Sequence, residues 1–220
     1  MRLIAHRGFA AVAPENTRAA IGEATAVADA VEVDVRRCAT GEPVVIHDET
    51  VDRVTDGSGP VADHTLAELR ALDVLGTGEG VPTLEAVLAA VPDSIGVVVD
   101  LKTAGTETAV DRLSRPGAVV SSFAPALLSA CRDRDPSVSR ALLTDDGGPA
   151  AVETAADLGC ARLQPSLDCC DGRLVERAHA AGLTVDVWTI ERRAAAESAA
   201  RWGADGVIAD RPGVRPELVE

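Results

Sequence analysis

Short apolar runs rich in β-branched residues alternate along this chain with longer stretches rich in Ala, Leu and Glu. The short runs predict buried strands, and the longer stretches predict amphipathic helices. Eight such pairs in 220 residues indicate an α/β protein with the (β/α)8 TIM barrel fold, near the lower size limit of that fold. An open doubly wound sheet is the alternative, and the number of strands favours the barrel. The predicted strands are residues 2–6, 30–36, 95–101, 117–121, 139–143, 161–164, 184–188 and 206–208, and the predicted helices are residues 16–28, 83–91, 105–113, 124–132, 148–157, 171–180, 191–201 and 213–219.

The interval after the second predicted strand breaks this alternation. Residues 39–42, Ala-Thr-Gly-Glu, have the composition of a turn, and residues 43–47 form another apolar run. Only 12 residues separate Asp34 from His47, which suits a β-hairpin better than a helical crossover. With residues 39–42 as the loop, Asp34 and His47 are expected to lie directly opposite each other on one face of the hairpin.

The segment that follows, residues 49–82, is polar and rich in glycine, with a short helix expected near residues 66–72. We expect it to be a small insertion over the barrel mouth, because a segment of this size is too short to hold a core of its own. The whole chain, residues 1–220, is therefore predicted to form a single barrel domain.

Acidic residues dominate the charge of the chain, which has 35 Asp and Glu against 20 Arg and one Lys, and a net charge of −14. So acidic a surface argues against nucleic acid or an anionic membrane as a partner. Two explanations of this composition are open: a salty cytoplasm, whose ions screen the repulsion, or a GC-rich genome that favours Arg over Lys. The second explains the missing lysines but not the excess acid, so we expect a protein of a salt-adapted, halophilic organism.

The five cysteines are odd in number, and none has the Cys-x-x-Cys spacing of a zinc or redox site. We interpret them as small buried hydrophobes in a reducing compartment. The sequence starts directly with an apolar strand, and no apolar stretch approaches the ~20 residues of a membrane span. A cytoplasmic protein without stable membrane insertion is expected, and no feature of the sequence indicates an oligomeric state.

Carboxylates occupy the ends of two predicted strands. Barrel enzymes place their reactive groups at the C-terminal ends of the strands, and Glu32 and Asp34, two residues apart, share one face there. Because charges that point into a barrel are costly unless paired or metal-bound, we expect one divalent cation, Mg²⁺ or Ca²⁺, as their partner. Asp100, at the end of the next predicted strand, completes a set of three oxygen ligands. The alternative is that Glu32 and Asp34 form salt bridges with Arg36 or Arg37.

Two histidines are expected beside these carboxylates, His6 at the end of the first strand and His47 at the end of the hairpin. Imidazole titrates near neutrality, so one ring could accept a proton from a nucleophile while the other donates a proton to a leaving alkoxide. The other two histidines, His64 and His179, are expected to be surface or capping residues.

Two cations and one aromatic residue also fall at strand ends. Arg7 follows His6, and Lys102, the only lysine of the chain, follows Asp100 by two positions. Both could neutralise the oxygens of a phosphate group, Arg7 through its bidentate fork and Lys102 as a point charge. Trp188 ends the seventh predicted strand, where it could wall a substrate pocket or pack in the core.

Together these segments resemble the glycerophosphodiester phosphodiesterase family. The resemblance spans the whole chain, and the joint pattern is specific although each piece alone is weak. It implies a barrel that hydrolyses glycerophosphodiesters to sn-glycerol 3-phosphate and an alcohol, with one divalent cation, Mg²⁺ or Ca²⁺. It also implies His6 and His47 as the acid/base pair, Glu32 and Asp34 as metal ligands, Arg7 and Lys102 as phosphate-binding residues, and Trp188 as a pocket wall. The matching segments are Ile4-Ala5-His6-Arg7-Gly8, Pro14-Glu15-Asn16-Thr17, Glu32-Val33-Asp34-Val35, Val44-Val45-Ile46-His47-Asp48, Pro82-Thr83-Leu84-Glu85, Trp188-Thr189 and residues 203–212.

Two positions depart from the family pattern. The family usually has Glu-x-Lys where this chain has Asp100-Leu101-Lys102, and Asp is shorter by one methylene. A metal would then have to shift, or a water would have to intervene, and the sphingomyelinase D-like phospholipases are similar in using Asp there. Glu191 stands where Asn is common, with little expected consequence.

Two other functions stay open at this point. One is a lysophospholipase D or sphingomyelinase D-like phosphodiesterase that acts on a lipid, which the low apolar content of residues 49–82 disfavours. The other is a non-catalytic phosphate-binding barrel, which would need the cations but not the paired histidines, His6 and His47. A small-molecule substrate is expected in either enzymatic case, and the sequence leaves open whether water or the glycerol 2-hydroxyl attacks first.

Overall fold

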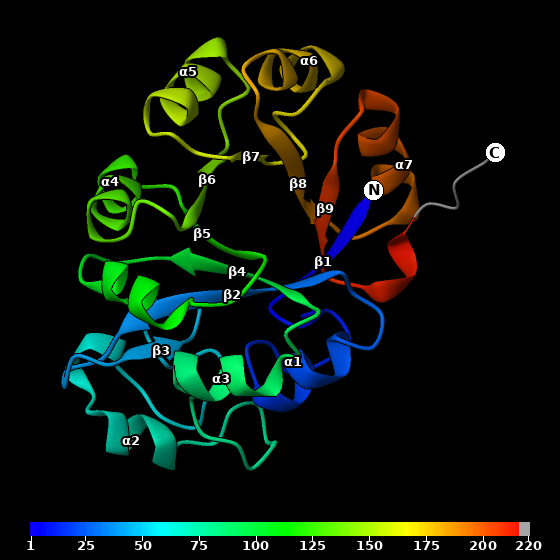
Figure 1. Cartoon of the computed structure of the whole chain (residues 1–220). Helices are drawn as coiled ribbons and strands as arrows, with labels where there is room; N and C mark the ends of the chain where they lie inside the picture. The colour runs from blue at the N-terminus through cyan, green and yellow to red at the C-terminus, as the bar shows by residue number, and fades with distance from the viewer. Residues whose placement is uncertain (216–220) are drawn as a thin grey trace.

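The structure, a computed structural model, describes residues 1–215 of the chain. Eight parallel strands form a closed ring in the order β1-β9-β8-β7-β6-β5-β4-β2, and β1 pairs with β2 to close it (Figure 1). The predicted barrel is thus confirmed, because an open doubly wound sheet would leave two strand edges unpaired. The strands are β1 Arg2–His6, β2 Ala30–Arg37, β3 Pro43–Val45, β4 Gly96–Leu101, β5 Ala118–Ser122, β6 Ser139–Thr144, β7 Arg162–Pro165, β8 Thr184–Ile190 and β9 Gly206–Ala209.

The helices surround the ring of strands, as Figure 1 shows. Among residues 1–215, none of these helices combines the length and the apolarity that a membrane crossing requires. The α-helices are α1 Arg18–Ala24, α2 Leu66–Ala71, α3 Leu84–Ala90, α4 Pro125–Arg134, α5 Pro149–Asp157, α6 Gly172–Ala180 and α7 Arg193–Trp202, and the 3₁₀ helices are η1 Val61–Asp63, η2 Thr106–Arg112 and η3 Pro212–Val214.

Alternation along the strands separates two hydrophobic layers, because successive side chains of a strand point to opposite faces. The outward residues of β2, Val31, Val33 and Val35, are fully buried in the large core between strands and helices. The inward residues of the ring form a separate apolar cluster that includes Ile4 and Val98. The polar side chains at the C-terminal strand ends continue this inward face.

Several predicted helices differ from the observed ones. The helix expected over residues 16–28 covers only Arg18–Ala24, because Thr17 is its N-cap and accepts a hydrogen bond from the Ala20 amide at 3.2 Å. The helix expected over residues 105–113 is the 3₁₀ helix η2, which starts after Gly105 in the left-handed region at φ +91°. The expected helix over residues 213–219 is replaced by η3 up to Val214, and residues 216–219 of that prediction lie outside the described residues.

The hairpin is observed, but its predicted register is wrong by one residue. β3 runs antiparallel to β2 with Val35 opposite Val45 and Arg37 opposite Pro43. The loop has three residues, 39–41, rather than four, because Gly41 adopts φ +98° and lets Glu42 pair with Cys38. Asp34 therefore bonds to Ile46, whose amide donates to the Asp34 carbonyl at 3.0 Å, and is not directly opposite His47.

The segment 49–82 contributes apolar side chains to a small buried cluster that also contains residues of the hairpin. The segment lies beside the hairpin and β2, at the lower left of Figure 1. Its buried apolar side chains pack against the hairpin. The cluster is shared with the hairpin, so the segment is stabilised by the strands that it leaves. We call it the insertion cluster; its buried residues are Cys38, Val44, Ile46, Val51, Val54, Val61, Leu69, Val74 and Val81.

Candidate active site

The register of the parallel strands brings the predicted carboxylates together. His6 on β1 pairs with Glu32 on β2, and Asp34 on β2 pairs with Asp100 on β4. All four residues have inward parity, so their side chains converge at the C-terminal end of the barrel. One ligand oxygen from each of Glu32, Asp34 and Asp100 lies within 4.8 Å of the other two, and all three residues are buried.

The three carboxylates differ in their electrostatic surroundings. Burial and the neighbouring charge of Asp34 raise the pKa of Glu32 to about 7. Burial also raises the pKa of Asp100 to about 6, although the Lys102 ammonium opposes this. Burial would raise the pKa of Asp34 as well, but Lys102 and Arg7 hold the pKa of that carboxyl well below its usual range. Without a further cation, Asp34 thus carries a negative charge, whereas the carboxyls of Glu32 and Asp100 bind protons more readily than usual.

The donor set fits a hard divalent cation. Carboxylate oxygens are the ligands that Mg²⁺ and Ca²⁺ prefer, and such a cation would offset the repulsion within the cluster. Asp100 Oδ1 is buried with no hydrogen-bond partner in the structure, so one ligand-type oxygen is available there. The shorter side chain of Asp100 does not keep it out of the cluster.

The two predicted phosphate-binding cations contact the carboxylates directly. Lys102 Nζ lies 2.9 Å from Asp34 Oδ1 and also contacts Asp100 Oδ2. Arg7 Nε lies 3.0 Å from Asp34 Oδ2, and Asn16 Nδ2 donates to the same oxygen at 2.9 Å. The ion pairs of Asp34 are therefore with Arg7 and Lys102, and not with the arginines that follow it on β2.

The two histidines have different carboxylate partners. His6 Nδ1 lies 2.6 Å from Asp210 Oδ1, and its Nε2 lies 4.0 Å from Glu32 Oε2. Burial acts to lower the pKa of His6, but the Asp210 hydrogen bond and the Glu32 charge leave it above its ordinary value. His47 Nδ1 lies 2.7 Å from Asp48 Oδ1, and burial leaves the pKa of His47 below its ordinary value. The two rings thus differ in proton affinity, as a donor and an acceptor must.

A network of charged side chains connects the segments that carry His6 and His47. Arg53, in the insertion, donates from both Nη atoms to Glu15 at 2.8 Å. Glu15 accepts from Arg7 Nη1 at 3.1 Å, and Arg53 Nε lies 2.5 Å from the carboxylate of Asp48. Arg7 and His47 are therefore held through the same insertion arginine.

These residues line one cavity of about 100 Å³. Trp188 forms part of its wall: the indole Nε1 donates to the Gln164 carbonyl at 2.7 Å, and the ring meets Phe123 edge-on with centroids 5.5 Å apart. Trp188 also packs against the inner apolar cluster, so both roles considered for it are compatible. All eight site residues predicted from the sequence line this cavity: His6, Arg7, Glu32, Asp34, His47, Asp100, Lys102 and Trp188.

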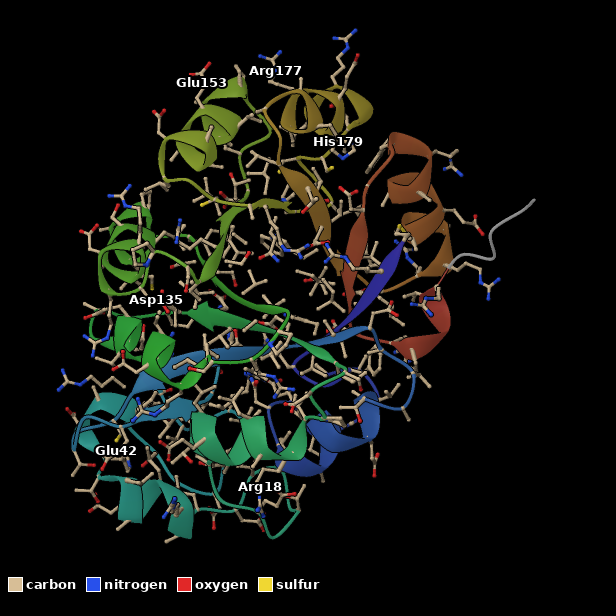
Figure 2. The ribbon with its side chains drawn as sticks, viewed as in Figure 1. Arg18, Glu42, Asp135, Glu153, Arg177 and His179 are labelled. Atoms are coloured by element: carbon tan, nitrogen blue, oxygen red, sulfur yellow. The ribbon has the colours of Figure 1, made fainter. Side chains whose placement is uncertain are left out.

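Several residues of the site were missed by the sequence analysis. Asp210, which holds His6, directly follows the last strand, so the rule of strand ends could have identified it. Asn16 was considered only as a helix cap, yet it adopts φ +60° and hydrogen-bonds Asp34. Arg53 carries no signal in the sequence, because its partners come from distant segments. The two contrast histidines lie elsewhere; His64 contacts the Pro60 carbonyl, and His179, labelled in Figure 2 on α6, contacts Asp205 at 2.9 Å.

Proteins of one known family are similar to this chain in sequence and in fold. The sequence model of the glycerophosphoryl diester phosphodiesterase family matches residues 6–113 and 101–214. A glycerophosphodiester phosphodiesterase of Caldanaerobacter subterraneus subsp. tengcongensis is 33% identical over 99% of this chain and 97% of its own length.

Solved structures agree. An Oleispira antarctica phosphodiesterase in complex with the product sn-glycerol-3-phosphate superposes with a TM-score of 0.90 at 30% identity, over 96% of this chain and 94% of that one. A glycerophosphodiester phosphodiesterase of Agrobacterium tumefaciens superposes with a TM-score of 0.85 at 29% identity, over 97% of this chain and 98% of that one. The chain therefore belongs to the glycerophosphoryl diester phosphodiesterase family.

Proposed function

We propose that this protein is a phosphoric diester hydrolase that cleaves glycerophosphodiesters to sn-glycerol 3-phosphate and an alcohol. The observation that carries this proposal is a single cavity that gathers two histidines, two cations and three buried carboxylates in a member of this family. The product complex of the Oleispira antarctica relative supports the same chemistry. Release of sn-glycerol 3-phosphate from a glycerophosphodiester tests it.

The side chains divide the work of phosphodiester cleavage. His6 and His47 form the acid/base pair, one taking the proton of the attacking hydroxyl and the other protonating the leaving oxygen. Asp210 and Asp48 fix the orientation of the two rings through their Nδ1 atoms. Arg7 and Lys102 neutralise the negative charge that develops on the phosphoryl oxygens. Trp188 walls the cavity against the organic part of the substrate.

We assign the carboxylate cluster to one divalent cation, Mg²⁺ or Ca²⁺, held by Glu32, Asp34 and Asp100. A cation bound there supplies Lewis-acid polarisation of the phosphoryl oxygens. All three carboxylate residues are nearly inaccessible to solvent. Water therefore screens the site less, and the charge of a bound cation would interact more strongly with the substrate.

Thermal unfolding at two pH values tests this metal site without an activity assay. The raised pKa values of Glu32, about 7, and Asp100, about 6, mean that the metal-free fold loses stability as pH rises from about 4.5 through 7. A cation must displace these protons, so Mg²⁺ or Ca²⁺ at about 5 mM should raise Tm more at pH 8 than at pH 5. The measurement is Tm with chelator and with each cation. An equal rise at both pH values, or none, would contradict the assignment.

A small head group suits the site better than a lipid chain. Most apolar side chains of the insertion are buried in the insertion cluster or packed against it, and Leu75 is an exposed exception. The active-site cavity of about 100 Å³ likewise has little room for an acyl chain. We therefore favour water-soluble glycerophosphodiesters over lysophospholipids.

The cellular setting follows from composition and is also a proposal. The excess of acidic residues supports a salt-adapted cytoplasm, with a net charge of −14 that ions would screen. All five cysteines are free thiols, which supports a reducing compartment. The same charge disfavours nucleic acid as a partner.

A further inference from the structure

A second cavity, of about 330 Å³, lies beside the active site. Its wall comes from the end of β2, the start of the insertion and the segment after β4. Arg36, Arg37 and Glu49 supply its charged groups, and Thr103 is part of the same wall. The reaction mechanism above makes no use of this cavity.

The second cavity is close to the catalytic groups. Arg36 follows Asp34 by two residues on the same face of β2, which places its backbone about 7 Å further along the strand. Its Nε donates to the backbone carbonyl of His47 at 2.7 Å, so one arginine joins both cavities. Thr103 is the neighbour of Lys102 in the chain. A substrate held at Lys102 could therefore extend its alcohol portion toward Arg36.

The charge of the second cavity is unusual for so acidic a protein. Arg7 and Arg53 at the active site both have carboxylates within 4.0 Å. Within residues 1–215, by contrast, neither Arg36 nor Arg37 forms an ion pair at that distance. Arg36 and Arg37 thus both line this cavity without a carboxylate in ion-pair contact, although the charges of Glu49, Asp34, Asp48 and Asp100 act on Arg36 from further away.

The side chain of Arg37, an exposed residue, lies close to two glycine turns. A Cβ atom added to Gly105 would come within 2.9 Å of Arg37 Cδ, and one added to Gly41 would come within 3.2 Å of Arg37 Nη2. Both glycines have positive φ, at +91° and +98°, so their backbones make turns that leave room for this side chain. The guanidinium therefore lies between the hairpin loop and the segment after β4.

We propose that this cavity binds an anionic group, a phosphate or a carboxylate, carried by the alcohol portion of the glycerophosphodiester. The Arg side chain presents a planar fork of donors that matches the oxygens of either anion, and two of them are available here. The inference rests on the function proposed above and adds a substrate class to it. Diesters with an anionic alcohol are thus preferred over those with a neutral or cationic one.

Matched substrates test the proposal. Glycerophosphoinositol and glycerophosphoinositol 4-phosphate differ only in the second phosphate. Glycerophosphoserine carries a carboxylate beside an ammonium group, and glycerophosphocholine carries only a cation. We expect the wild-type kcat/KM to be about tenfold higher for the 4-phosphate than for glycerophosphoinositol, mainly through KM, which corresponds to about 1.4 kcal/mol. The relative rate on glycerophosphoserine tells a carboxylate site from a phosphate site. A ratio near one for both anionic substrates, or a preference for glycerophosphocholine, would overturn the proposal.

Variants of Arg37 make the test specific to this cavity. In Arg37→Gln the kcat/KM for the 4-phosphate should be close to that for glycerophosphoinositol. Arg37→Lys should recover part of the preference, because lysine restores the positive charge but not the planar pair of donors. The control is Arg177→Gln, an exposed position on α6 across the ring from β3 (Figures 1 and 2), which should keep the wild-type ratio. An unchanged ratio in Arg37→Gln would contradict the assignment.

A binding measurement separates this inference from the proposed activity. Inositol 1,4-bisphosphate carries both anionic groups but no scissile diester, and calorimetry gives its Kd for each variant. Weaker binding by Arg37→Gln than by Arg177→Gln supports the anion site even if no diester is cleaved. Equal binding by the two variants rejects the anion site, whereas hydrolysis of none of the four diesters by the wild type rejects the proposed activity.

Discussion

Replacing His6 with alanine is expected to lower kcat for glycerophosphodiester hydrolysis by about 10²–10⁴-fold, the usual contribution of a positioned general acid or base. The imidazole lies between Asp210, at 2.6 Å from Nδ1, and Glu32, at 4.0 Å from Nε2. Alanine cannot transfer a proton, and no other described residue reaches the same position. KM should change less, because the proposed phosphate-binding residues, Arg7 and Lys102, are unchanged in this variant. Steady-state kinetics with saturating metal measure both constants.

The matched control for this variant is His179→Ala. That histidine lies on α6 away from the cavity, where it contacts Asp205 (Figure 2). Its replacement should leave kcat within about twofold, because surface substitutions have small effects. If the two alanine variants had similar activity, proton transfer through His6 would be excluded. Circular dichroism of both proteins checks that they are folded.

Asp34→Asn should have an effect of similar size through a different cause. Asp34 is 1% exposed and pairs with Lys102 at 2.9 Å and with Arg7 at 3.0 Å. The amide removes the charge that joins both cations to the proposed metal, and losing several kcal/mol of transition-state stabilisation corresponds to about 10³-fold in kcat. Breaking one side of a buried ion pair also costs about 3–5 kcal/mol of stability, so Tm should fall clearly.

Two measurements separate these effects of Asp34→Asn. The rise in Tm produced by Mg²⁺ or Ca²⁺ in the wild type should be largely lost in the variant, and kcat should fall at temperatures where the variant is still folded. Glu153→Gln, an exposed position on α5 labelled in Figure 2, is the matched control and should retain both properties. A variant that kept the metal-induced rise in Tm would show that Asp34 is not a ligand.

The sequence predicted the site well where two simple rules operate. Parity along a strand places Glu32 and Asp34 on one face, and the parallel register of a barrel brings strand ends together. These rules depend only on the positions of the strands, which the apolar runs mark clearly. They predicted that His6, Asp100 and Lys102 lie close together, and in the structure all three line one cavity.

The remaining features depend on contacts that are distant in the sequence or on turn geometry. The hairpin register was wrong by one residue because the conformation of Gly41, and not composition, sets the length of the loop. Arg53 pairs with Glu15, about 40 residues away in the sequence, and Asp210 pairs with His6, about 200 residues away. The insertion cluster was not predicted in detail, because it joins valines of the segment 49–82 to Cys38, Val44 and Ile46 of the hairpin.

The central claim is that this chain is a metal-dependent glycerophosphodiester hydrolase. The most direct measurement is the release of sn-glycerol 3-phosphate from glycerophosphocholine by the purified protein in high salt, with and without chelator, with lysophosphatidylcholine as the lipid comparison. We predict release of sn-glycerol 3-phosphate that chelator abolishes and added Mg²⁺ or Ca²⁺ restores, with little turnover of lysophosphatidylcholine. Choline release from lysophosphatidylcholine but not from glycerophosphocholine, or activity insensitive to chelator, would contradict the claim.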